Sequence, residues 1–137
     1  MSKQAKALEQ QLANTPLFAQ TTSKQRKAIA RAGKVLTWKE GEMGVKEGSK
    51  AAAFYMILEG STIVEKDGAV VNRLRVGDFF GEVALLSGGA RTANVTAAED
   101  CTLFALGRPA FKAVVEADPP LSLALLKAMS QRLAAQS

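Results

Sequence analysis

The sequence predicts a mainly β domain with flanking helices: an antiparallel, jelly-roll-like β-roll of about eight strands. Three observations lead to this fold class. Between Lys34 and Gly107 the chain consists of short apolar runs separated by turn residues, which is typical of all-β units with many short strands. Before and after this region, apolar residues recur at helical spacing. The 137 residues, of which 47% are hydrophobic, are enough to bury one core.

Two helices are predicted before the β-roll. The segment Ser2–Ala13 is rich in Ala, Gln, Lys and Leu, with apolar residues at helical spacing, so a short amphipathic helix is expected there. The segment Thr15–Phe18 contains a proline and ends this helix. The second helix is expected over about residues 23–32, with Ser23 at the N-cap position and Gly33 as the C-terminal stop.

The predicted strands follow from the short apolar runs. They cover residues 35–39, 45–47, 53–58, 61–66, 69–75, 91–98 and 101–106. The pair Asp67-Gly68, between two of these runs, is the strongest local hairpin signal in the chain. In segment 91–98 the residue types alternate, so Arg91 is expected on the inner face together with Val95. The segment Glu82–Leu86 is rich in Ala and Leu and is expected to form one or two helical turns instead.

Two further helices are expected after the last strand. Gly107-Arg108-Pro109 fits the start of a helix with proline in its first turn, and Asp118-Pro119-Pro120 separates this helix from a last one over Leu121–Ala135. The terminal helices would cover the open edges of the roll. The expected organisation is a single domain over residues 1–137, with N-terminal helices at 1–33, the β-roll at 34–107 and C-terminal helices at 108–137.

The residue types that are present argue against enzymatic chemistry. The chain has no histidine and one cysteine, which removes most ligands of zinc, copper and non-haem iron sites and every Ser-His-Asp or Cys-His arrangement. A non-catalytic protein without a metal or other cofactor is therefore expected. Because Cys101 cannot form an internal disulfide and no signal sequence or membrane-spanning run is visible, the expected compartment is the cytoplasm.

The net charge of +5 is distributed unevenly. Residues 1–50 carry ten Lys or Arg and four Glu, whereas residues 51–137 carry eight basic and nine acidic residues. The basic excess includes a cluster around the second predicted helix: Lys24, Arg26, Lys27, Arg31 and Lys34. Such a cluster can contact nucleic acid or an acidic partner, but no aromatic residues interleave it. A solvated face is expected, without direct nucleic-acid binding.

Residues 79–93 are the candidate binding segment. Between Asp78 and Glu99 lie 20 residues, of which only Glu82 and Arg91 are charged, although a chain with 23% charged residues would place about five there. The free amides of a helical turn that begins at Gly81, together with the guanidinium of Arg91, suit a phosphate. The carboxylate of Glu82 only accepts hydrogen bonds, so it matches a ligand hydroxyl such as that of a ribose. A phosphate beside a sugar hydroxyl indicates a nucleotide.

These residues resemble a known motif. Phe80-Gly81-Glu82-Val83-Ala84-Leu85-Leu86, followed by Ala90-Arg91-Thr92-Ala93-Asn94-Val95, resembles the phosphate-binding cassette of cyclic nucleotide-binding domains. This is the family of the catabolite activator protein, kinase regulatory subunits and cyclic nucleotide-gated channels. The resemblance covers roughly residues 15–133, through further segments in the family's order: Pro16–Phe18, Glu40–Glu42, Glu47-Gly48, Phe54–Gly60, Val76–Asp78 and Arg108–Phe111.

The resemblance implies cAMP or cGMP as the ligand. It assigns the ribose 2′-hydroxyl to Glu82 and the cyclic phosphate to Arg91. The supporting donors that it implies are the main-chain amides of Gly81, Val83, Ala84, Thr92 and Ala93. Threonine at position 92 is compatible with either purine. Ala90 stands where many relatives have proline, which implies a less preorganised loop.

The resemblance also implies an output. The last helix would act as a lid over the base, with Arg132 stacking on or hydrogen-bonding to the purine and with Leu121, Leu125 and Met129 near the same face. An effector protein would read the C-terminal helices. Two alternatives stay open: a protein-interaction or scaffold module with a degenerate pocket, and the sensing fragment of a larger regulator or channel. A cupin-like enzyme on a similar roll lacks its histidine ligands.

Overall fold

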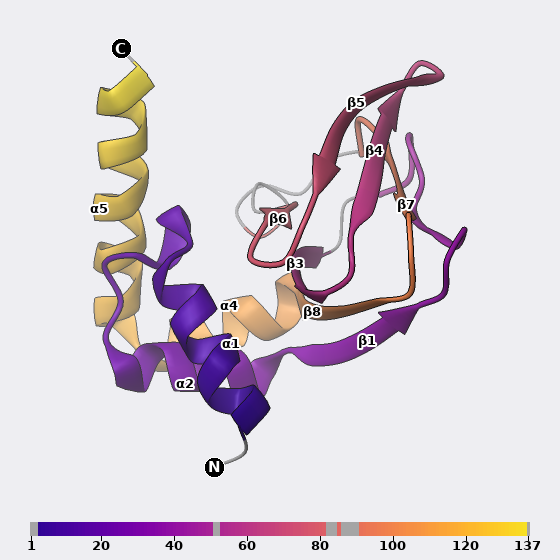
Figure 1. Ribbon diagram of the computed structural model, residues 1–137. Helices are drawn as coiled ribbons and strands as arrows, with labels where there is room; N and C mark the ends of the chain where they lie inside the picture. Colours follow the sequence, from indigo (N-terminus) through magenta and orange to yellow (C-terminus); the bar gives the residue numbers. More distant parts are fainter. Residues whose placement is uncertain (1–2, 51–52, 82–84, 86–90, 137) are drawn as a thin grey trace. The chain divides into compact units, whose positions relative to one another are not determined.

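The computed structural model describes residues 3–50, 53–81, 85 and 91–136. The chain forms two compact units (Figure 1). The β unit is Lys34–Arg108, and the helical unit combines Met1–Gly33 with Pro109–Ser137. The candidate binding segment 79–93 therefore belongs to the β unit.

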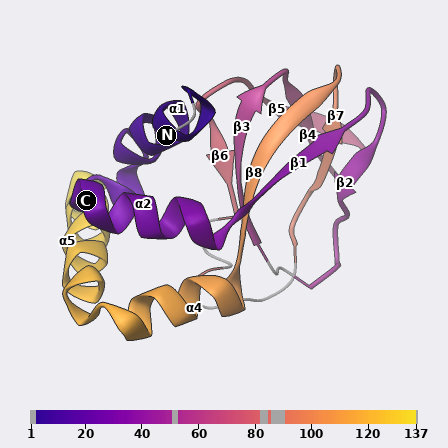
Figure 2. The same ribbon diagram turned by 90° about the horizontal axis from the view of Figure 1, so that it is seen from below.

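The described residues of the β unit form eight strands. They are β1 (Lys34–Trp38), β2 (Met43–Val45), β3 (Ala53–Glu59), β4 (Thr62–Lys66), β5 (Ala69–Leu74), β6 (Phe79–Phe80), β7 (Asn94–Ala97) and β8 (Cys101–Gly107). They pair in two antiparallel sheets with the orders β1-β8-β3-β6 and β2-β7-β4-β5. Figure 2 shows β1, β8 and β3 side by side in the first sheet. This architecture confirms the predicted antiparallel β-roll.

Side chains from both sheets form the core of the β unit. In β7 the burial alternates as predicted, because Val95 and Ala97 are buried whereas Asn94 and Thr96 are only partly buried. One buried cluster consists of Trp38, Val45, Ile57, Leu74, Val95, Ala97, Cys101 and Leu103, with Tyr55, Val64 and Phe80 packed against it. The second residue of the candidate segment, Phe80, thus packs against this core.

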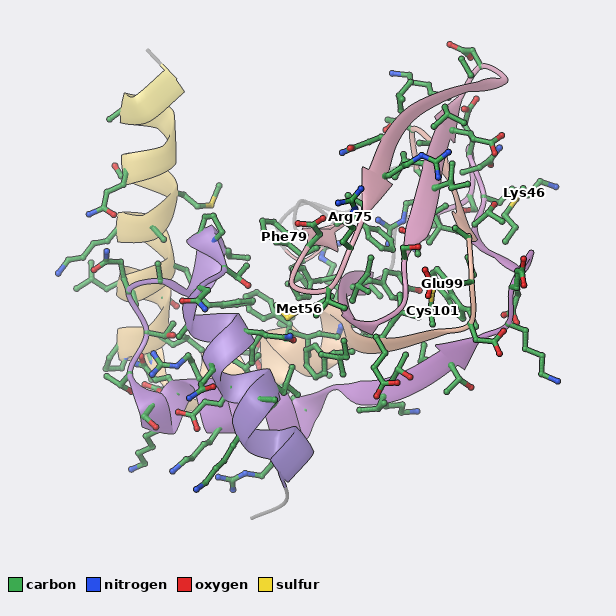
Figure 3. All side chains as sticks on the ribbon, in the orientation of Figure 1. Lys46, Met56, Arg75, Phe79, Glu99 and Cys101 are labelled. Atoms are coloured by element: carbon green, nitrogen blue, oxygen red, sulfur yellow. The ribbon has the colours of Figure 1, made fainter. Side chains whose placement is uncertain are left out.

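The turn before β6 fixes the start of the candidate segment. Gly77 adopts φ +91°, a left-handed conformation that favours glycine, and Oδ2 of Asp78 accepts a hydrogen bond of 2.8 Å from the Arg75 amide. β6 then pairs with β3, so that Met56 lies opposite Phe79 (Figure 3). With two residues, β6 is too short for a detectable alternation, which explains why no strand was predicted there.

Two predicted strands differ from the structure by more than one residue, whereas the bounds of the others agree to within one residue. The strand expected at 45–47 is Met43–Val45, because the chain leaves the ladder after Val45 and the Glu47 amide donates to Oδ1 of Asn94 at 2.6 Å. The strand expected at 91–98 is only Asn94–Ala97. Arg91 therefore precedes the strand, and its direction is not set by the strand alternation.

The helical unit contains the helices predicted before and after the β-roll, whereas the helical turns predicted at Glu82–Leu86 lie almost entirely outside the described residues. The helices of this unit are α1 (Lys3–Ala13), a 3-10 turn η1 (Pro16–Phe18), α2 (Ser23–Ala32), α4 (Arg108–Ala117) and α5 (Pro119–Gln136). The last helix starts at Pro119, two residues before the predicted Leu121, because the first turn of a helix tolerates proline. None of the helices in the described ranges is long and apolar enough to cross a membrane.

The ends of α2 differ from the prediction. The N-cap is Thr22, not Ser23: its hydroxyl accepts from the Gln25 amide, and the Gln25 side chain accepts from the Thr22 amide in a capping box. The Ser23 hydroxyl instead donates to Glu9 of α1. Gly33 follows the helix in an extended conformation, with φ −92°, so it ends the helix without a left-handed cap.

Gly44 gives Trp38 its place in the core. A Cβ atom at Gly44 would lie 2.1 Å from Cζ2 of Trp38, which is far inside van der Waals contact. The indole therefore lies directly against the backbone of β2. The centroid of the Trp38 ring is 5.6 Å from that of Tyr55. The two rings pack against each other, so Trp38 helps to position Tyr55 in the first sheet.

We expect Gly44→Ala to destabilise the protein by about 1–3 kcal/mol, because the added methyl group overpacks the core against the indole. Urea denaturation measures the free energy of unfolding. Trp38→Phe provides the matched partner, since a smaller ring makes room for the methyl group. The double variant should be less destabilised than the sum of the two single variants; strictly additive losses would contradict the contact.

Candidate functional site

Arg91 and Gly81 meet at the start of β3. Nη2 of Arg91 donates a hydrogen bond to the carbonyl oxygen of Ala53. Gly81 adopts φ +82°, and a Cβ atom there would lie 2.6 Å from the Ala53 oxygen and 2.6 Å from Nη1 of Arg91. Glycine is thus required at position 81 both for its backbone conformation and for the space that the guanidinium occupies.

The guanidinium of Arg91 lies over the ring of Tyr55. Tyr55 belongs to an aromatic cluster, the aromatic platform, which we define as Trp38, Tyr55 and Phe80. Cζ of Arg91 is 5.8 Å from the centroid of the Tyr55 ring, within cation–π range. Tyr55 in turn stacks on Phe80, with centroids 5.0 Å apart and planes inclined by 21°. The platform thus supports the cation through Tyr55.

The main chain of Arg91 is held as firmly as its side chain. Its amide donates to the Ser49 carbonyl at 2.7 Å, and its carbonyl accepts from the Gly48 amide at 2.8 Å. Both partners belong to the turn after β2, where Gly48 has φ +85°. Because two hydrogen bonds fix the backbone of Arg91 outside any strand, the loop before β7 presents the side chain in a defined direction.

The electrostatics of Arg91 favour an anion as its partner. Burial lowers the pKa of the Arg91 guanidinium from its ordinary value, and the neighbouring Tyr55 partly raises it. Arginine nevertheless stays charged, since its ordinary pKa lies far above neutral. Within the described parts of the chain, no carboxylate lies within 4.0 Å of Arg91, whereas two other cations, Arg26 and Lys112, have such partners. A partly desolvated cation in this setting is suited to a phosphate.

The structure places part of the predicted site. Gly81 and Arg91 are in contact, and Thr92 and Ala93 follow Arg91 in the loop before β7. Thr92 is exposed and Ala93 is partly buried. The predicted roles of Glu82, Val83 and Ala84, and the departure at Ala90, lie outside the described residues. Arg132 belongs to α5 in the helical unit, and its side chain also lies outside the described part.

Two contributors to the site were not predicted. Tyr55, which the sequence did not single out as a site residue, is partly buried and carries the cation–π contact. An arginine and a tyrosine 36 positions apart give no local pattern that would connect them. The Ala53 carbonyl is a main-chain group, so its role does not depend on a residue type that a motif could reveal.

The described residues contain no group of three or more His, Cys, Asp or Glu side chains that could hold a metal ion. Cys101 is buried, and its thiol donates to the carbonyls of Ser61 and Glu99 at 3.0 and 3.1 Å. Burial raises the pKa of this thiol, so it stays neutral at physiological pH. Among the described residues of the site, the groups placed to contact a ligand are the Arg91 side chain and main-chain groups.

Comparison with known proteins connects this geometry to a family. Residues 35–118 match the family model described as cyclic nucleotide-binding domain. The chain is 34% identical over 122 residues to the potassium/sodium hyperpolarization-activated cyclic nucleotide-gated channel 3 of Homo sapiens, covering 89% of this chain and 16% of the channel. It is 37% identical over 101 residues to the cAMP-dependent protein kinase regulatory subunit of Debaryomyces hansenii, covering 73% of this chain and 22% of that subunit.

A solved structure gives the same result for the fold. The N-terminal domain of a transcriptional regulator from Streptomyces coelicolor superposes with a TM-score of 0.87 at 26% sequence identity, covering 93% of this chain and 94% of that one. Against the curated relatives above, in contrast, the chain spans less than a quarter of their length. Since the family model covers well over half of the 137 residues, the chain belongs to the cyclic nucleotide-binding domain family.

Proposed function

We propose that this chain is a non-catalytic regulatory module that binds cAMP or cGMP through residues 79–93 and signals by movement of its last helix. One observation carries the proposal: the guanidinium of Arg91 is partly buried between the Tyr55 ring and Gly81, without a carboxylate partner among the described residues. A cyclic phosphate supplies a full negative charge to this cation. Membership of the cyclic nucleotide-binding family supports this choice of ligand.

The proposed contacts divide the ligand into two halves. Arg91 binds the cyclic phosphate, and Glu82 accepts a hydrogen bond from the ribose 2′-hydroxyl, because a carboxylate would repel the phosphate. Main-chain amides add donors without adding charge: Gly81, Val83, Ala84, Thr92 and Ala93. Glycine at position 81 lets the guanidinium lie against the main chain, because a Cβ atom there would lie 2.6 Å from Nη1 of Arg91.

The proposed output is conformational. In this reading α5 is the lid, Arg132 contacts the purine, and an effector protein reads the C-terminal helices. Ligand can shift the lid equilibrium only by the difference in its affinity for the two lid positions. We propose the cytoplasm as the compartment. The curated relatives are several times longer than this chain, so this module is equally suited to be the sensing part of a larger regulator or channel.

We expect cAMP, cGMP or both to raise the melting temperature. A ligand that binds only the folded state adds about 2.7 kcal/mol to the free energy of unfolding when its concentration is 100 times its dissociation constant. Differential scanning calorimetry with each nucleotide measures the shift and identifies the preferred purine. Adenosine, which lacks the phosphate, is the control and should give a much smaller shift. If neither cyclic nucleotide changes the melting temperature, the chain is an interaction or scaffold module instead.

We expect the 2′-hydroxyl to account for a large part of the affinity. Replacing the preferred nucleotide by its 2′-deoxy form should weaken binding roughly 10- to 100-fold, because a hydrogen bond to a charged group contributes about 1.5–3 kcal/mol. Isothermal titration calorimetry measures both forms. In Glu82→Ala the two forms should bind about equally. A variant that still discriminates between them would rule out Glu82 as the acceptor.

We expect Arg91→Gln to weaken cyclic nucleotide binding far more than Arg132→Gln. Loss of a desolvated, hydrogen-bonded charge costs about 2–5 kcal/mol, whereas a contact between Arg132 and the uncharged purine is worth about 0.5–1.5 kcal/mol. Titration calorimetry gives the two affinities, and urea denaturation shows that both variants are folded. The opposite ranking would contradict the assignment of the phosphate to Arg91.

A further inference from the structure

The site around Arg91 lies at the start of β3, and a cavity lies near the opposite end of this strand. It has a volume of about 470 Å³ and is open to solvent on the β unit. Its lining includes Gly60 and Ser61 from the turn after β3, Arg73 and Arg75 from β5 and the turn that follows, and Glu99 from the turn between β7 and β8. β3 has seven residues, so its two ends are about 20 Å apart at about 3.3 Å per residue. The cavity is therefore distinct from the site around Arg91.

The strand register directs two arginines to this cavity. Thr62 pairs with Leu74 and Ile63 pairs with Arg73 in the β4–β5 ladder. Opposite residues share a face of the sheet, and residues two positions apart on a strand do as well. Arg73 and Arg75 thus lie on one face, together with Ser61, whereas Thr62 and Leu74 turn to the buried face.

The charges of this cavity are unbalanced. Arg73 and Arg75 are exposed, and within the part of the chain that is described neither has a carboxylate within 4.0 Å. The one acid in the lining, Glu99, accepts a hydrogen bond of 2.8 Å from the Ser61 hydroxyl. Figure 3 labels Arg75 and Glu99. Two guanidinium groups are suited to a doubly charged oxyanion, and the carboxylate is suited to a hydroxyl on the same molecule.

The frame of the cavity is preformed. Gly60 has φ +85°, and a Cβ atom there would lie 2.5 Å from the Asp100 carbonyl, so the turn after β3 packs directly against the turn before β8. The Ser61 carbonyl accepts hydrogen bonds from the Ala98 amide and the Cys101 thiol, both at 3.0 Å. The main chain of Ser61 is held by these hydrogen bonds and its side chain by the bond to Glu99. Ligand binding would therefore not have to order Ser61.

We propose that this cavity is a second anion site, separate from residues 79–93. Its ligand is a small molecule that carries a doubly charged oxyanion together with a hydroxyl group. Sugar phosphates and hydroxy-dicarboxylates share this chemistry. Arg73 and Arg75 bind the oxyanion, and Glu99, oriented by Ser61, accepts from the hydroxyl. The proposal is independent of whether the first site binds a cyclic nucleotide.

Titrations with ribose 5-phosphate, malate and sulfate test the site. The change in amide chemical shifts of the full chain locates the binding, and shifts should centre on Ser61, Arg75 and Glu99. The variant with both Arg73→Gln and Arg75→Gln should bind at least about tenfold more weakly, as expected for the loss of charge-assisted hydrogen bonds. Lys66→Gln, an exposed cation on β4, is the matched control and should change the affinity less than twofold.

Three results would overturn the proposal. The first is that no probe binds at millimolar concentration. The others are that Lys66→Gln and the double arginine variant lose the same amount of affinity for the probe, or that only Arg91→Gln loses affinity. Comparison of ribose 5-phosphate with malate identifies which source of the oxyanion is preferred. Arg91→Gln should leave the chemical-shift changes at Ser61 and Glu99 intact, because that arginine belongs to the other site.

Glu99→Gln tests the hydroxyl contact. The variant keeps an acceptor for the Ser61 hydroxyl but removes the negative charge. Sulfate has no hydroxyl, so its affinity should rise when the repelling carboxylate is neutralised. Ribose 5-phosphate loses the charged acceptor for its hydroxyl group. The ratio of the affinity for ribose 5-phosphate to the affinity for sulfate should therefore fall severalfold. An unchanged sulfate affinity would show that Glu99 does not face the anion and would refute this arrangement.

Discussion

The arrangement of the candidate site depends on the partial burial of the Arg91 guanidinium group. Removing water from Arg91 disfavours its charged form, which is why burial lowers its pKa. The protein compensates with the Ala53 carbonyl and with the ring of Tyr55, contacts that are together worth a few kcal/mol at most. Neither contact carries a full negative charge. An anionic ligand can therefore add a full charge that neither of these two described contacts supplies.

The sheet register makes this arrangement specific. Ala53 and Tyr55 are two residues apart on β3, so their side chains share one face, and the pairing of Tyr55 with Phe80 places Gly81 immediately beyond the ladder. A slip of one residue in the β3–β6 pairing would turn Phe80 to the opposite face and would put a side chain where Gly81 now lies. The left-handed turn at Gly77 prevents this slip, because it fixes the residue at which β6 starts.

The sequence was sufficient for those features that depend on local residue types. The helices, the hairpin at Asp67-Gly68 and the isolated charges of segment 79–93 are all encoded within a few neighbouring residues, and the predicted fold class agrees with the two sheets. The predictions were wrong or incomplete where a residue far away in the sequence determines the local structure. β2 ends early because the Glu47 amide binds Asn94, 47 positions away. Likewise, Arg91 takes its direction from Ala53 and Tyr55, and no local pattern contains that information.

Desolvation, more than the number of cations, distinguishes the two proposed anion sites of this β unit. Arg73 and Arg75 are exposed, so salt screens their attraction to an anion over a Debye length of about 8 Å at physiological ionic strength. Arg91 is partly shielded by the aromatic platform, where the local dielectric constant is lower and each charge contact is stronger. A single shielded arginine can therefore bind a singly charged cyclic phosphate. At the proposed second site, two exposed arginines are needed to bind a doubly charged group, and the expected affinity is lower.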